Sequence, residues 1–236
     1  MNYLFQGFVL ILQPGLKRYV FIPLLINIAL FIGLFFLSKH FFHQLSVWVM
    51  QLLPTWLQWL QSILWIVFAI GFFFVILYTF VTLANIIAAP FNNLLSEKVE
   101  IFLGRKPLQE KSMKELMMDI PRTIMRQLQI IGYYIPRALV LAILFFVPII
   151  QIFAGLLWFF FHAWLMTLQY IDYPADNHRI DFPHLRAMLL KKRSVSLSFG
   201  MASFIVTMIP FLNFISMPAS VAGGTALWVR EFCDDV

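Results

Sequence analysis

A turn followed by two adjacent cations lies directly before a long uncharged stretch, between Gln13 and Arg18. Pro14 and Gly15 favour a turn, and the free backbone N–H groups at the start of the following helix form a natural anion site. Lys17 and Arg18 add two full charges, and a guanidinium can donate two parallel hydrogen bonds to an oxyanion. The pattern predicts an oxyanion site here. The alternative is that both cations only anchor a helix end at a membrane surface.

A second polar group lies where another uncharged stretch ends, and it combines three asparagines with a glutamate. Amide side chains donate hydrogen bonds without a net charge, which suits a path that partly dehydrates an anion and still releases it. The alternative is that the asparagines form hydrogen bonds between helices. The carboxylate would repel an anion unless cations lie nearby, and the following charged region supplies two arginines. The predicted path comprises Asn85, Asn92, Asn93, Glu97, Arg122 and Arg126.

Other patterns argue against an enzyme or a metal centre. Asp172, Asp176 and His178 form a cluster, but one cluster without further ligands is weak evidence for metal binding or acid–base catalysis. A hydrogen-bonded connector is the better interpretation of these residues. The chain contains no P-loop, no HExxH and no GxSxG motif, and Cys233 is its only cysteine. We therefore predict no metal, no cofactor and no enzymatic activity.

The composition places these residues in a membrane. Of 236 residues, 61% are hydrophobic and 12% are charged, and the mean hydropathy is +0.85. Since a soluble domain carries about 25% charged residues, this chain has too few polar side chains to cover a water-facing surface. The short alternating segments of an outer-membrane barrel are also not the pattern seen. The net charge of +6 comes from loops beside apolar stretches, which is typical of membrane proteins rather than of nucleic-acid binding.

The uncharged stretches define the elements that must position these residues. We predict an all-α membrane protein that forms one integral membrane domain over residues 1–236. Along the chain, the predicted elements are an interfacial segment at 1–18, transmembrane helices at 19–37 and 62–89, a charged cytoplasmic helical region at 97–137, and further apolar stretches at 138–171 and 194–229. Between the two transmembrane helices, residues 39–61 carry the tryptophans of an interfacial helix.

The last two apolar stretches are each long for one span, short for two, and broken near the middle by Pro148 or Pro210. We predict two helical hairpins that enter the bilayer partway and return. Their tips need protein around them because lipid cannot satisfy free backbone groups, which favours an oligomer. Every Lys and Arg except Lys39 then lies on one side, which the positive-inside rule makes cytoplasmic. Small residues near the C-terminus predict close helix packing: Ala219, Gly223 and Ala226.

Taken together, these stretches resemble the CysZ-type sulfate permeases of the bacterial inner membrane. The resemblance runs nearly from end to end and is carried by QPGLKRYVFIPLLIN, LANIIAAPFNNLLSEKVE, DIPRTIMRQ, YYIPRALVLAILFFVP, QYIDYPADNH and TMIPFLNFISMPASVAGGTALWV. It implies a multi-pass oligomer in the lipid bilayer, with two long helices and partly inserted hairpins, that takes up sulfate for cysteine synthesis. It places the family's sulfate motif on Gly15, Leu16, Lys17 and Arg18. Because Lys17 lacks the bidentate fork of arginine, Arg18 should matter more.

The charge of sulfate constrains how it crosses. A negative interior of 100 mV opposes entry of a dianion by about 4.6 kcal/mol, or roughly three decades of concentration. The apolar stretches contain no acid, and His162 is their only candidate proton carrier. We therefore favour passive, channel-like permeation drawn by consumption inside the cell. Proton-coupled symport through His162 is one alternative, and a membrane scaffold or lipid-active protein that binds sulfate incidentally is another. Sulfite and thiosulfate stay open as further substrates because their oxygens are similar.

Overall fold

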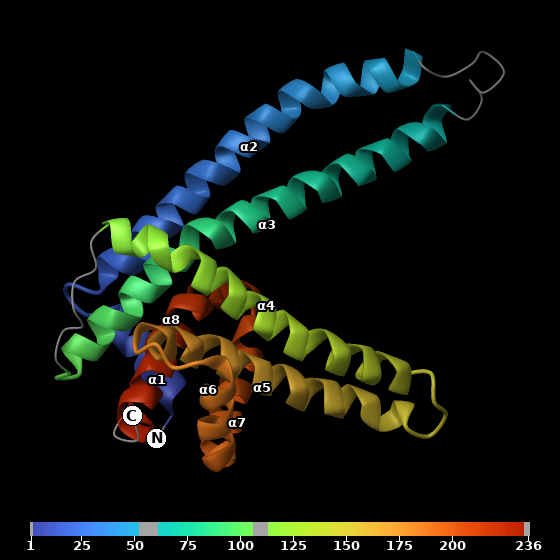
Figure 1. Ribbon diagram of the computed structural model, residues 1–236. Coiled ribbons are helices and arrows are strands. Elements are labelled where there is room, and N and C mark those ends of the chain that lie inside the picture. Colours follow the sequence, from blue (N-terminus) through green and yellow to red (C-terminus); the bar gives the residue numbers. More distant parts are fainter. Residues whose placement is uncertain (1, 52–60, 106–112, 234–236) are drawn as a thin grey trace. The chain divides into compact units, whose positions relative to one another are not determined.

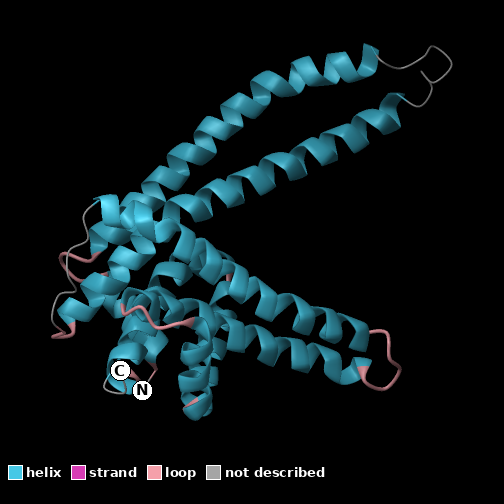
Figure 2. Ribbon diagram, viewed as in Figure 1, coloured by secondary structure: helices cyan, strands magenta, loops and turns pink. Residues whose placement is uncertain are grey.

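Every regular element in the described residues is an α-helix (Figure 1 and Figure 2). The structure, a computed structural model, describes residues 2–51, 61–105 and 113–233. The helices are α1 (Tyr3–Ile11), α2 (Lys17–Gln51), α3 (Gln61–Phe102), α4 (Met113–Leu144), α5 (Gln151–Asn177), α6 (Phe182–Lys191), α7 (Arg193–Thr207) and α8 (Pro210–Glu231). Within these ranges no strand occurs, which confirms the predicted helical class. The chain divides into two compact units, residues 18–91 and residues 1–17 with 92–236. We call them the α2–α3 unit and the terminal unit.

The α2–α3 unit is a pair of long apolar helices that expose most of their side chains. Aromatic rings bridge the pair: Phe42 contacts Trp65, and the centroids of Phe31 and Phe80 lie 5.4 Å apart. The sequence Lys17–Trp48 in α2 and the sequence Trp65–Ala84 in α3 are each long and apolar enough to cross a membrane. In water, this much exposed apolar surface would be unfavourable, so the unit is built for a lipid environment.

Both long helices extend beyond the predicted spans. α2 continues as far as Gln51, because no glycine or proline interrupts it after the predicted end at residue 37. The predicted interfacial segment at 39–61 is therefore helical and continuous with α2 through Gln51, and its Trp56 and Trp59 lie outside the described residues. α3 passes through Pro90 and ends at Phe102, so the predicted span at 62–89 and the start of the charged region belong to one helix.

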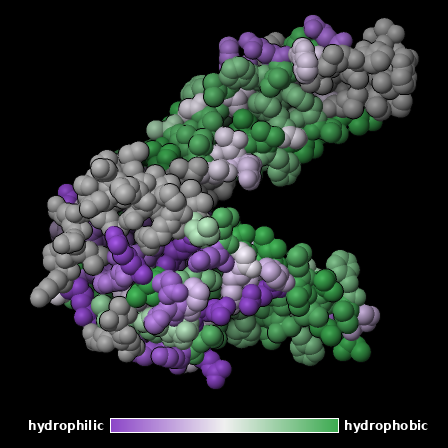
Figure 3. Space-filling model, viewed as in Figure 1, coloured by the Kyte–Doolittle hydropathy of each residue, from purple (hydrophilic) through white to green (hydrophobic). Residues whose placement is uncertain are grey.

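In the terminal unit, both predicted proline breaks are confirmed as breaks between helices. α4 and α5 run side by side and are joined by the turn at residues 145–150, which contains Pro148 (Figure 1). Pro210 is the first residue of α8, a position where its missing N–H has no intrahelical partner to lose. The outer part of α4 and α5 presents a hydrophobic surface (Figure 3). α5 is itself long and apolar enough to cross a membrane, whereas the sequence predicts it to be one arm of a hairpin.

The first and last helices of the terminal unit make backbone contact. A Cβ atom added at Gly7 would lie 2.0 Å from the carbonyl oxygen of Ala219 and 2.7 Å from the amide nitrogen of Gly223. A Cβ atom added at Gly223 would lie 2.6 Å from the carbonyl oxygen of Tyr3. Ala219 and Ala226 are fully buried. These contacts confirm the close packing that the small residues predict, and they place α1 firmly on α8.

Gly7→Ala should destabilise the protein, because the added methyl group meets backbone atoms that cannot rotate away. We expect a loss of about 1–3 kcal/mol, which corresponds to a fall in Tm of about 2–4 °C per kcal/mol for a chain of this size. Thermal unfolding of the purified protein in detergent measures this shift. Gly132→Ala is the matched control, since a Cβ atom there has open space around it. An equal Tm for both variants would contradict the close contact.

Candidate anion site and its supporting contacts

The turn that connects α1 to α2 requires glycine for its backbone conformation. Gly15 has φ of +91°, in the left-handed region that other residues rarely adopt. The carbonyl oxygen of Gln13 accepts hydrogen bonds from the amides of Leu16 and Lys17, at 3.1 and 3.4 Å. Leu16 is buried with 3% of its surface exposed. The turn therefore combines one buried side chain with a left-handed glycine.

The two cations of the predicted motif are exposed at the first turn of α2. The Arg18 Nη2 atom donates to the Tyr19 hydroxyl over 2.9 Å, and its guanidinium lies 4.8 Å from the centre of that ring. In the described part of the chain, neither Lys17 nor Arg18 forms an ion pair. No carboxylate therefore neutralises the charge at this helix start, where the helix dipole also favours an anion.

A hydrogen-bond network anchors the N-terminus of α1 to the end of α8. The Tyr3 hydroxyl donates to Glu231 Oε1 over 2.7 Å, and Lys192 Nζ lies 3.3 Å from Glu231 Oε2. Burial, followed by the bond to Glu231, raises the pKa of Tyr3 to about 12. The hydrogen bond from Tyr3 and the charge of Lys192 lower the pKa of Glu231. The carboxylate form of Glu231 thus holds α1, and with it the turn before α2.

The buried face of α3 in the terminal unit carries a row of polar contacts to α5 and α8. Asn92 Nδ2 donates to the Tyr173 hydroxyl over 3.3 Å, and the carbonyl oxygen of Asn93 accepts from Asn177 over 3.3 Å. Of the predicted path residues, Asn92 therefore bonds between helices through its side chain, as the alternative interpretation states, whereas Asn93 takes part through its backbone. Glu97 is partly exposed and pairs with Lys98 at 3.0 Å.

Two further contacts on this face were not predicted from the sequence. Ser96 Oγ accepts from Thr225 over 3.0 Å, and Glu100 Oε2 lies 2.7 Å from His178 Nε2. Glu100 is buried with 2% of its surface exposed. Asn92, Ser96 and Glu100 follow one another at intervals of four residues. Because residues four apart share one face of a helix, this spacing could have predicted that the three side chains lie together. Glu100, which was not among the predicted path residues, is therefore paired with a histidine, whereas the predicted Glu97 pairs with Lys98.

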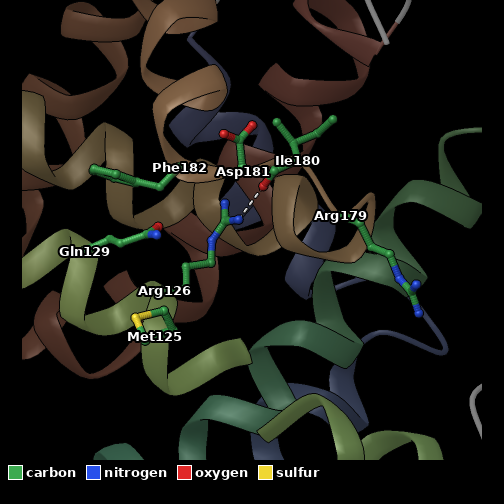
Figure 4. Close-up of a pocket in the computed structure, with 7 residues that line it drawn as sticks. All are labelled: Met125, Arg126, Gln129, Arg179, Ile180, Asp181 and Phe182. Carbon is green, nitrogen blue, oxygen red and sulfur yellow. Dashed lines mark hydrogen bonds between the residues drawn. The ribbon is translucent and has the colours of Figure 1, made fainter. Parts of the chain in front are cut away.

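Arg126 is a buried cation that joins α4 to the end of α5. Its Nε donates to Asp172 Oδ1 over 2.8 Å, and its Nη1 lies 3.7 Å from Asp176 Oδ1. Nη1 also donates to the carbonyl oxygen of Ile180 (Figure 4). Only 6% of the Arg126 side chain is exposed. Arg126 thus has its charge compensated within the fold. A cavity of about 260 Å³ lies beside it, lined by Met125, Arg126, Gln129, Arg179, Ile180, Asp181 and Phe182.

The predicted cluster of Asp172, Asp176 and His178 is divided between two partners. Both aspartates face Arg126, and His178 pairs with Glu100. In the described residues no group of three acidic, histidine or cysteine side chains is arranged to hold a metal ion. The connector interpretation is confirmed by these hydrogen bonds, which lie at the end of α5.

The other predicted residues divide into described and undescribed side chains. His162 Nδ1 lies 3.1 Å from the carbonyl oxygen of Trp158, and its ring stacks on Phe204 with centroids 5.4 Å apart. Asn85 lies in α3 and Arg122 in α4, but their side chains are outside the described part of the structure. The predicted path is therefore only partly placed by the structure.

Comparison with known proteins gives a consistent match over nearly the whole chain. Residues 3–218 match the family model described as sulfate transporter CysZ/etoposide-induced protein 2.4. The protein named sulfate transporter CysZ from Pseudomonas fluorescens (strain Pf0-1) is 46% identical over 234 residues, which cover 98% of this chain and 92% of that protein. Proteins of the same name are 44% identical in Pseudomonas aeruginosa (strain LESB58), with 98% and 94% covered, and 41% identical in Pectobacterium atrosepticum, with 98% and 85% covered.

Arg126→Met should destabilise the protein strongly, because it removes a buried cation that faces both Asp172 and Asp176. Removing one partner of a buried ion pair costs about 3–5 kcal/mol. Thermal unfolding in detergent measures the loss, with Arg193→Met as the control, since Arg193 is exposed at the start of α7. Adding Asp172→Asn to Arg126→Met should recover part of the Tm. A Tm of Arg126→Met equal to that of the control would contradict the structural role of this cation.

Acidification should weaken the anchor of α1. Because the pKa of Glu231 is lowered from its ordinary value of 4.5 in the folded protein, the associated stability is present above that value and is lost as the pH falls through the folded pKa. We expect the Tm of the wild type to fall as the pH is lowered from about 5. The Tm of Glu231→Gln should fall less. A pH series of melting curves for both proteins tests this, and parallel curves would remove Glu231 from the explanation.

Proposed function

We propose that this chain, which belongs to the sulfate transporter CysZ/etoposide-induced protein 2.4 family, carries sulfate across the bacterial inner membrane. Membership of a transport family also confirms the prediction that the chain is not an enzyme. One observation carries the proposal at the level of residues. Lys17 and Arg18 are exposed cations without a carboxylate partner in the described residues, and they stand at the start of a helix apolar enough to cross a membrane.

The proposed binding site is built from the turn and the first residues of α2. Gly15 supplies the left-handed backbone conformation of the turn, Leu16 anchors the turn by its burial, and Lys17 and Arg18 provide the charge. Sulfate would accept hydrogen bonds from the amides of the first helical turn that follow Lys17 and from the Arg18 guanidinium. Sulfite and thiosulfate carry similar oxygens, so the same groups would bind them. Recruitment at this site is the step that the residues support best.

The proposed arrangement in the membrane has α2 and α3 as the spanning helices. The α4–α5 and α7–α8 pairs enter the bilayer partway from the cytoplasmic side, where the basic residues gather. The backbone at the turns of these pairs needs protein around it. We therefore propose a homo-oligomer whose subunits cover one another's hairpin turns.

Beyond the binding site, the proposed path follows the polar residues of α3 and α4. Asn85, Asn92, Asn93, Glu97 and Arg122 provide amide and charged groups along it. Arg126 contributes by holding α4 against α5, since its charge is engaged by Asp172 and Asp176. Alternating engagement of amides with neighbouring side chains and with the anion would lower the cost of partial dehydration.

The proposed mechanism is passive, and consumption of sulfate for cysteine synthesis draws the flow inward. The opposing potential of about 4.6 kcal/mol per 100 mV for a dianion is overcome if the internal concentration is kept low. His162 in α5 contacts the rings of Phe204 and Trp158. Among the described residues, these contacts provide no acidic side chain that could accept a proton from His162. A passive path needs no such chain of titratable side chains, whereas a proton-coupled path does.

Uptake of radiolabelled sulfate into proteoliposomes without ATP tests the proposal. We expect flux at zero membrane potential, slower flux when the interior is negative, and loss of at least about tenfold with Arg18→Ala. Lys39→Ala is the matched control, because Lys39 is an exposed cation elsewhere on α2 and should leave the flux unchanged. Gly15→Ala should reduce the flux as well, since alanine is strained at this φ.

Three outcomes would count against the proposal or change its mechanism. Flux no higher than that of empty liposomes would reject this chain as a sufficient permease and favour a scaffold role. Equal losses with Arg18→Ala and Lys39→Ala would reject the specific site. Uptake driven by an inward proton gradient and abolished by His162→Ala would replace passive permeation with symport.

A further inference from the structure

Tyr133 in α4 lies where three helices of the terminal unit meet. Its hydroxyl accepts a hydrogen bond from the Trp164 Nε1 atom of α5 over 3.0 Å. Phe182, the first residue of α6, packs against the ring of Tyr133 in an edge-to-face arrangement at 5.8 Å. The ring of Tyr133 is therefore fixed in position by both neighbouring helices.

Two arginines share this fixed ring. The Arg137 guanidinium carbon lies 3.8 Å from the ring centre, and its Nη1 donates to the Tyr133 carbonyl oxygen over 2.8 Å. The Arg186 guanidinium carbon lies 5.5 Å from the same ring centre. Arg137 is exposed and Arg186 is half-exposed. In contrast to Arg126, neither forms an ion pair within the described residues. Two like charges held near one ring repel each other, and a bound anion would relieve that repulsion.

Apolar residues surround Arg137 on α4. Residues 128–144 form an apolar helical stretch, and Arg137 is the only charged residue between Arg126 and Asp172. Its exposed neighbours along the helix are aliphatic: Ile131, Ile135, Leu139, Val140 and Ile143. A soluble anion would leave these side chains in contact with water. A lipid brings acyl chains that cover them together with the phosphate that pairs with the cations.

The position of Arg137 along α4 matches the depth of lipid headgroups. The Cα atom of Arg137 lies eight residues, or about 12 Å, before the turn that begins at Phe145. Helical side chains tilt toward the N-terminus, and this one reaches back over Tyr133, about 18 Å from the turn. Half of the hydrocarbon thickness is about 15 Å. If the turn reaches the middle of the bilayer, as the proposed membrane arrangement has it, the guanidinium lies at the headgroup level.

We propose that Arg137 and Arg186, oriented by Tyr133, bind the phosphate of an anionic membrane lipid. The phosphate would accept charge-assisted hydrogen bonds from both guanidiniums, while the acyl chains lie along the aliphatic face of α4. The bound lipid would fix the depth of the α4–α5 hairpin. Free sulfate and inorganic phosphate share the same oxyanion chemistry, so the test must separate them from a lipid.

Binding of fluorescent phosphatidylglycerol to the full-length protein in detergent is the direct measurement. Arg137→Gln with Arg186→Gln should weaken the affinity by at least about tenfold. The control, Lys191→Gln with Arg193→Gln, removes the same charge from exposed positions on α6 and α7 and should change the affinity less than about twofold. Equal losses in the two double variants would overturn the site in favour of general charge attraction.

Variants of Tyr133 separate a built site from two independent cations. Tyr133→Phe keeps the ring, and binding should be retained within about threefold, whereas Tyr133→Leu keeps both charges but removes the surface that orients them and should bind weakly. Melting curves establish that each variant is folded. Binding by a folded Tyr133→Leu variant at the wild-type affinity would overturn the role of the ring.

Competition identifies the source of the phosphate. Sodium sulfate and sodium phosphate should displace the lipid no better than sodium chloride at equal ionic strength. Selective displacement by either oxyanion at low millimolar concentration, lost in the Arg137 and Arg186 double variant, would overturn the lipid assignment and identify a soluble-anion site. Because the readout is lipid binding, this test is independent of the flux that tests sulfate transport.

Discussion

The ion pairs between Arg126 and the two aspartates at the end of α5 fix the base of the α4–α5 pair. Arg126 is buried and lies 46 residues before Asp172 in the sequence. The same guanidinium donates to the backbone of Ile180, which positions the short connection that leads into α6. Because a buried cation needs its partners, these contacts commit α4, the end of α5 and the start of α6 to one arrangement. The ring of Tyr133, two helical turns further along α4, lies where it does as a result.

Polar contacts play an unusually large part in a chain that carries few charges. α3 meets α5 and α8 through amide, hydroxyl and carboxylate groups at Asn92, Ser96 and Glu100. α1 meets α8 through backbone contact at Gly7 and a hydrogen bond at Tyr3. Apolar packing alone would specify these helices weakly, since their outer surfaces are also apolar. Hydrogen bonds in the interior select one arrangement, and that arrangement carries the turn at Gly15.

The sequence was sufficient to predict features that depend on local chemistry. Pro148 lies in the turn between α4 and α5 and Pro210 begins α8, because proline has no backbone N–H and is favoured in turns and at the first position of a helix. Gly223 packs against a backbone because it has no side chain. The partners of charged residues could not be predicted in the same way. Arg126 was expected along a path, and its pairing with Asp172 depends on how α4 and α5 align. The extension of α2 to Gln51 was also missed, because a charge at Lys39 marks a membrane boundary without ending a helix.

The contact between α1 and α8 joins the two ends of the chain, since Tyr3 and Glu231 are separated by 228 positions. During synthesis, α1 is made long before α8, the helix that holds it. Until α8 is made, Gly7 lacks the backbone of Ala219 and Gly223 against which it packs. The contacts that hold α1, and with it the cationic turn, therefore form only after α8 has been made. A prematurely terminated product would carry the same motif without the surface that holds it in place.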